Sequence, residues 1–148
     1  MSYQEKRSLV NIASTILITA LYAAFMMQRY PAADPYSREV FHFWGSFFLI
    51  LIPISIVARI LIYIVFSIFN YIATREEEPP IIDERDKLIE LRAGQLSLYG
   101  FAVGVMLAMG SLVVEQPPSV MFIILICAGV VSEIISELAQ FYFYRRGF

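Results

Sequence analysis

The chain has 148 residues, of which 59% are hydrophobic and 16% charged, whereas soluble domains usually contain about 45–50% apolar and about 25% charged residues. This composition indicates a protein that folds in lipid. The net charge of −2 gives no support for direct nucleic-acid binding, and one histidine with one cysteine cannot form a zinc site of the usual kind. We expect no cofactor, and we expect Cys127, which lies in an apolar run, to be a buried free thiol.

Four apolar stretches are long enough to cross a bilayer as helices, which takes about 20 residues each. We predict an all-α polytopic membrane protein in which residues 1–148 form a single domain of four transmembrane helices. The predicted spans are about 8–28, 41–72, 88–114 and 118–144. Lys6 and Arg7 precede the first stretch as in a signal peptide, but its length and the lack of a cleavage signal predict a retained span.

Positive charges are distributed unevenly between the two sides that these spans define. The external loops carry only Arg29 and Arg38. The cytoplasmic segments carry eight positive residues, namely Lys6, Arg7, Arg75, Arg85, Lys87, Arg92, Arg145 and Arg146. The positive-inside rule therefore predicts that both termini are cytoplasmic. We also expect an outer aromatic belt of Tyr30, Tyr36, Phe41, Phe43 and Trp44.

Residues 75–86 (REEEPPIIDERD) form a charged segment that we expect to be a cytoplasmic loop. Pro79 and Pro80 should end the second helix. Asp83 is the predicted N-cap of the third helix, whose first turn is acidic, as the helix dipole favours. Pro117 and Pro118 should mark the start of the fourth helix in the same way.

Small residues share one face of the third span, at spacings of three and four. This predicted helix-packing seam consists of Ser97, Gly100, Gly104 and Ala108. The central G-x-x-x-G pattern allows a neighbouring backbone to approach closely in lipid. The pattern fits packing within the bundle and a homodimer seam equally well. On the first span, Asn11, Thr15 and Thr19 share a polar face that should turn inward or towards a partner.

Three charged residues lie where the chain should be inside the membrane: Arg59, Glu133 and Glu137. Each costs about 2.5–3.5 kcal/mol at a bilayer centre on insertion scales. At a rise of about 1.5 Å per residue, all three fall at a similar depth on the inner side. Because the two glutamates are four residues apart on one helical face, we expect Arg59 to bridge both of them.

Three interpretations of this charge cluster stay open. The charges pair for structural reasons near the inner interface, or one carboxylate titrates in proton- or cation-linked transport. In the third interpretation the carboxylates join Asp83, Asp86 and Glu90 in binding a divalent cation. A catalytic carboxylate pair lacks a nucleophile and base to work with, so we do not expect an enzyme.

The start of the third helix resembles a family of small predicted membrane proteins of bacteria and archaea. The resemblance is carried by Asp83-Glu84-Arg85-Asp86, Leu88-Ile89-Glu90 and Arg92-Ala93. These proteins, domains of unknown function of the DUF2178 and DUF3796 sort, have a D-E-R-x-x-x-I-x-x-[KR]-[AS] signature between their second and third spans. The resemblance implies partnership with small helix-turn-helix repressors, and thus a regulator or sensor in the plasma (inner) membrane of a prokaryote. It assigns no catalytic residues.

Residues around this motif have two physical interpretations. They form either a capped helix with basic anchors at the headgroups or a docking surface for a soluble cytoplasmic regulator. The docking residues would be Asp83, Glu84, Arg85, Asp86, Glu90 and Arg92. The sequence therefore favours a non-enzymatic regulatory or sensory membrane protein acting as a homodimer. The alternative is a small proton- or cation-coupled transporter that uses Glu133 and Glu137.

Overall fold

The computed structural model describes residues 3–74 and 84–146, which form four helices in chain order. They are α1 (Tyr3–Met27), α2 (Arg38–Thr74), α3 (Glu84–Val113) and α4 (Pro118–Arg146). The predicted all-α fold is confirmed, and each helix is long and apolar enough to cross a membrane. Most of the predicted loop, with the predicted cap Asp83, lies outside the described residues, and the end of that segment is the first turn of α3.

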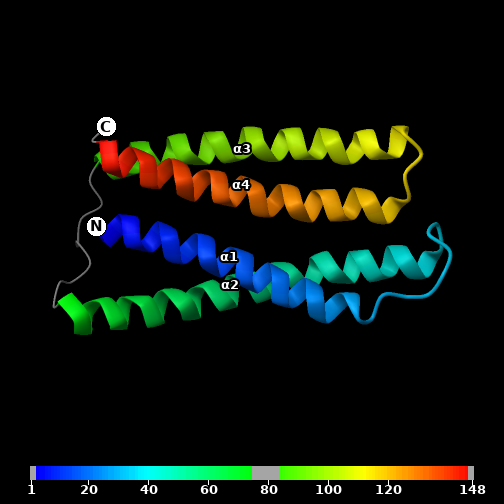
Figure 1. Ribbon diagram of the computed structural model, residues 1–148, viewed down its shortest axis with the longest axis horizontal. Helices are drawn as coiled ribbons and strands as arrows, with labels where there is room; N and C mark the ends of the chain where they lie inside the picture. The colour runs from blue at the N-terminus through cyan, green and yellow to red at the C-terminus, as the bar shows by residue number, and fades with distance from the viewer. Residues whose placement is uncertain (1–2, 75–83, 147–148) are drawn as a thin grey trace.

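The four helices form a row rather than a closed ring. α3 packs against α4, α4 packs against α1, and α1 packs against α2. α2 touches α4 at only a few positions, and in the described part of the chain α3 has no other helix neighbour. Both chain ends lie at one end of the bundle, called here the terminal end (Figure 1). α4 is therefore the one helix of the four described that contacts all three others.

The turn between α3 and α4 contains a residue in the left-handed region. Glu115 has φ 59°, and its N–H donates to the Leu112 carbonyl at 3.1 Å. The Gln116 N–H donates to the Ser111 carbonyl at 3.0 Å. These two bonds define a Schellman C-cap, in which the position of Glu115 usually holds glycine.

We expect Glu115→Gly to stabilise the protein. A left-handed L-residue costs about 1–2 kcal/mol, and glycine loses about 0.5–1 kcal/mol more in chain entropy on folding. The net gain should be about 0.5 kcal/mol, measured by thermal unfolding in detergent. Gln116→Gly is the matched control because Gln116 does not have a positive φ. Equal shifts for both variants would contradict the assignment of strain to Glu115.

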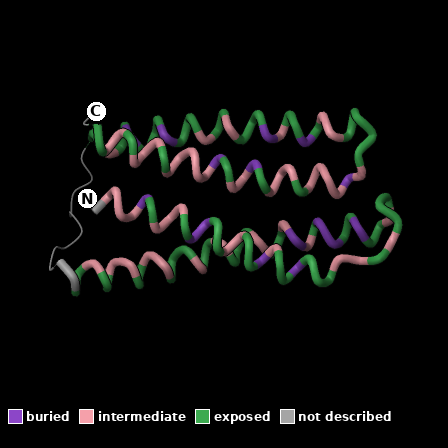
Figure 2. Tube along the Cα trace, viewed as in Figure 1, coloured by how far each residue is buried: buried purple, intermediate pink, exposed green. Residues whose placement is uncertain are grey.

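The buried core lies at the end of the bundle away from the termini, where α1, α2 and α4 meet (Figure 2). Val40, Trp44 and Phe47 on α2 are at most 1% exposed. The Trp44 ring stacks on Phe122 of α4 with centroids 5.4 Å apart, and the Tyr22 hydroxyl donates to the Phe47 carbonyl at 2.9 Å. Aromatic rings bury large areas, so this cluster fixes how α2 meets the other helices.

Only part of the expected outer aromatic belt is exposed at the surface. Tyr36 and Phe41 are exposed, but Phe43 and Trp44 are buried in the aromatic core. The hydroxyls of Tyr30 and Ser119 lie 2.8 Å apart, and the Trp44 indole N–H donates to the same Ser119 oxygen at 3.4 Å. These side chains hold helices together instead of anchoring them to lipid headgroups.

Candidate functional site

The charges that interrupt the apolar helices meet at the interface of α1, α2 and α4. Arg59 of α2 forms a salt bridge with Glu133 of α4. Its second terminal nitrogen, Nη2, donates to the Thr15 hydroxyl of α1 at 3.1 Å. Thr15 is buried, whereas the side chains of Arg59 and Glu133 are 43% and 29% exposed. The ion pair is therefore anchored on one side and open on the other.

The prediction that Arg59 bridges both glutamates is wrong. Glu137 Oε1 accepts a hydrogen bond from Asn11 Nδ2 of α1 at 2.8 Å, and Arg59 pairs with Glu133. Glu137 lies about 6 Å closer to the terminal end, one helical turn along α4. Asn11 lies one turn from Thr15 in the same direction. Each turn of the polar face of α1 thus meets a different charge of the cluster.

Glu137 also faces a polar pocket of about 140 Å³ at the terminal end of the bundle. Its Oε2 is buried and has no hydrogen-bond partner among the residues described. The pocket is lined by Gln4, Arg7, Ser8, Asn11, Asp86, Glu90, Glu137, Gln140 and Tyr144. These residues come from α1, α3 and α4, so the pocket joins the start of α3 to the central helix.

This polar pocket contains part of the predicted divalent-cation set. Asp86, Glu90 and Glu137 line it, but Glu133 does not, and Asp83 lies outside the described residues. Within residues 3–74 and 84–146, no group of three or more acidic, His or Cys side chains is placed to hold a metal ion.

The predicted helix-packing seam faces α4. A Cβ added at Gly104 would overlap the Ala128 Cβ and lie 3.3 Å from the Ala128 Cα. A Cβ added at Gly100 would lie 2.8 Å from Ile135 Cδ1. Ala108 is fully buried, and Ser97 is half-buried on the same face. Of the two interpretations of this seam, the structure has the one in which it packs within the bundle.

The motif at the start of α3 divides between the polar pocket and the surface. Asp86 and Glu90 line the pocket. Glu84, Arg85 and Arg92 are exposed. Sequence reasoning selected these residues but missed other pocket partners contributed by α1 and the end of α4, which are Gln4, Arg7, Ser8 and Tyr144. The polar face of α1, which the sequence left without an assigned partner, was the signal that could have located these residues.

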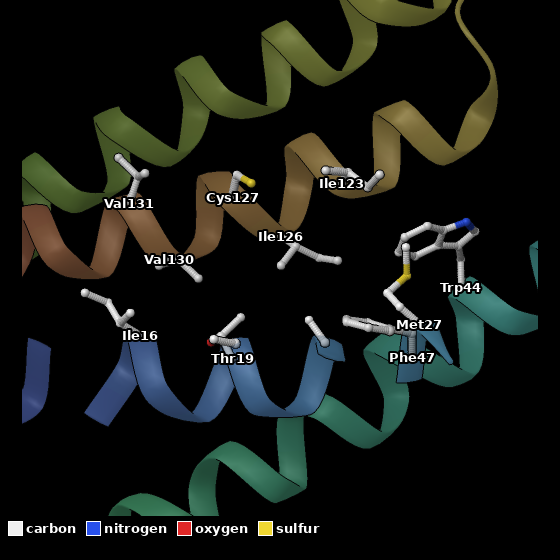
Figure 3. Close-up of a pocket in the computed structure, with 12 residues that line it drawn as sticks. Ile16, Thr19, Met27, Trp44, Phe47, Ile123, Ile126, Cys127, Val130 and Val131 are labelled. Carbon is white, nitrogen blue, oxygen red and sulfur yellow. The ribbon is translucent and has the colours of Figure 1, made fainter. Parts of the chain in front are cut away.

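An apolar cavity of about 460 Å³ lies between α1 and α4 and is closed at one end by α2. Ile126 and Val130 point from α4 towards α1, and Trp44 with Phe47 lies at the far end (Figure 3). Cys127 lines this cavity and is exposed. The expectation of a buried thiol was wrong, because α1 and α4 do not close over this turn.

No protein-family model matches the chain, and no similar curated protein or solved structure was found.

Proposed function

We propose that the chain is a non-enzymatic regulatory or sensory protein of a prokaryotic plasma membrane, with both termini in the cytoplasm. The observation that carries this proposal is the pairing of the charges within the apolar helices. Arg59 binds Glu133, and Glu137 binds Asn11. Such pairing lowers the cost of charge in lipid and leaves the polar pocket at the predicted cytoplasmic end as the place where the protein meets solution.

The proposed docking surface is the first turns of α3. Arg85 and Lys87 are exposed there, next to a pocket that reaches α4 through Glu137. A soluble partner bound to this surface would contact α3, which packs along α4, the helix that carries Glu133. This continuity offers a physical route by which an event in the membrane changes the docking surface. The resemblance of the motif to small membrane partners of repressors agrees with this role.

A homo-oligomer is part of the proposal, but its contact needs a surface other than the small-residue face of α3. That face packs on α4. α2 offers an unpacked surface, since none of its residues from 48 to 72 is buried. We therefore assign the oligomer contact to α2, on the side of the helix that does not face α4.

Photo-crosslinking tests the docking surface. A benzoylphenylalanine at position 87 should crosslink a soluble cytoplasmic protein in intact cells, because Lys87 is exposed at the predicted cytoplasmic end. The matched control is the same probe at position 38, since Arg38 is exposed at the other end of the bundle. Equal crosslinking at the two positions, or labelling of position 87 by an impermeant reagent from outside, would contradict the proposal.

The second candidate is a proton- or cation-coupled transporter, favoured by one observation. Glu137 has a buried oxygen without a partner in a polar pocket, as a titrating carboxylate in a transport site can have. Proton flux into proteoliposomes separates the two functions. The regulator should give none, whereas a flux that Glu137→Gln abolishes in a folded protein would establish the transporter.

A further inference from the structure

A second cavity, the α2–α4 groove, runs along the open side of the ion pair. It measures about 450 Å³, within the range of about 300–1,000 Å³ typical of small-molecule sites. Its polar lining residues are Thr19, Ser55, Arg59 and Glu133, and Gly129 lies in its floor. Its apolar walls include Phe48, Leu51, Ile52, Ile56, Phe101 and Leu125. Apolar walls with a few convergent polar groups are the usual features of a ligand site.

The guanidinium at one end of the groove has hydrogen-bonding capacity left over. Arginine has five N–H donors, and among the described residues Arg59 contacts Glu133 and Thr15. Its side chain is 43% exposed within the stretch of α2 that is long and apolar enough to span a membrane. Polar groups without partners are costly in hydrocarbon. An acceptor arriving through the groove would therefore be stabilised at Arg59.

The charge balance selects the kind of acceptor. Arg59 and Glu133 together carry no net charge, so the attraction of Arg59 for a second anion is offset by repulsion from the Glu133 carboxylate. A neutral carbonyl accepts hydrogen bonds from Arg59 without this penalty. The length of the groove fits a chain, because the stretch of α2 from Phe48 to Arg59 spans about 16 Å at the helical rise.

We propose that the α2–α4 groove binds a single-chain, membrane-dissolved molecule with a neutral carbonyl end that accepts hydrogen bonds from Arg59 while its chain lies along the apolar walls. The binding does not depend on the proposed regulatory function. A bound molecule would change the surroundings of the Arg59–Glu133 ion pair, which joins α2 to α4.

Photolabelling of the full-length protein in phosphatidylcholine vesicles tests this proposal. The probe is the methyl ester of a palmitic acid that carries a diazirine and an alkyne. It should saturate and label peptides of α2 and α4 that line the groove. Methyl palmitate should compete at least about tenfold better than heptadecane, the ratio that one hydrogen bond to a charged group supplies. Equal competition would identify ordinary bulk lipid and overturn the proposal.

Gly129→Leu provides an independent measurement in a protein that should fold. A Cβ at Gly129 meets nothing within 4 Å, and Gly129 lines the groove, so we expect the leucine side chain to occupy space in the groove. Labelling should fall to background in this variant. Gly110→Leu is the matched control, because Gly110 also has open space around its Cβ and lies on α3 away from the groove residues.

Three further outcomes would overturn the proposal. Unchanged labelling in Gly129→Leu would place the probe elsewhere. Stronger competition by palmitate than by its methyl ester would show that the groove prefers an anionic head group to a neutral one. Crosslinks from a probe at position 52 of α2 to a second copy, in place of ester labelling, would show that another chain fills the groove.

Discussion

Arg59→Met should destabilise the protein by about 1–3 kcal/mol, less than the cost of breaking a fully buried ion pair, because the Arg59 and Glu133 side chains are 43% and 29% exposed. The substitution leaves the Glu133 carboxylate without its cation in an apolar stretch of α4, where an unpaired charge is expensive. The Thr15 hydroxyl also loses its donor, but a threonine can instead bond to the backbone of its own helix. Equilibrium unfolding in mixed detergent micelles measures the loss.

Two double variants distinguish the partners of Arg59. Arg59→Met with Glu133→Gln should recover most of the loss, since no unpaired charge remains at this level. Arg59→Met with Glu137→Gln is the matched control and should recover little, because Glu137 is bound to Asn11 instead. Similar recovery in both doubles would mean that Arg59 interacts with the two carboxylates as a group. No recovery of stability in either double variant would contradict a structural role for the ion pair.

The ion pair shows how far sequence reasoning extends in this protein. Helix lengths and apolar runs predicted four spans, and counting residues along α2 and α4 predicted that Arg59 and the glutamates lie at similar depth. The choice of Glu133 over Glu137 was not predictable. It depends on the register between α2 and α4, which touch at few positions, and on α1, whose Asn11 takes Glu137.

The aromatic residues near the start of α2 show a second limit. Phe43 and Trp44 lie at a depth where either a lipid-facing belt or a buried cluster is expected. The two differ only in the rotation of the helix about its axis, which the sequence of α2 alone does not determine. The Ser119 hydroxyl and the Phe122 ring of α4 select the buried arrangement, and both are far away in the sequence.

Gly104→Ala should have the largest effect of any single methyl group added to α3. The new Cβ would overlap the Ala128 Cβ, with backbone close behind it, so α3 and α4 must move apart. Overpacking of this kind costs about 1–3 kcal/mol, and Gly104→Leu should cost more. At Gly100 the nearest atom is the end of the Ile135 side chain, which can change rotamer at about 0.5–1.5 kcal/mol, so Gly100→Ala should be mild.

A compensating substitution separates this clash from other effects of changing glycine. Ala128→Gly removes the methyl group that a new Cβ at position 104 would strike, so adding it to Gly104→Ala should restore most of the lost stability. Gly110→Ala is the control, because its Cβ meets nothing within 4 Å and alanine favours a helix by about 1 kcal/mol. If thermal unfolding shows Gly104→Ala to be as stable as Gly110→Ala, the seam is not a packing surface. A loss at Gly104 that Ala128→Gly leaves unchanged, with oligomeric state falling in parallel, would instead place a second copy at this face of α3.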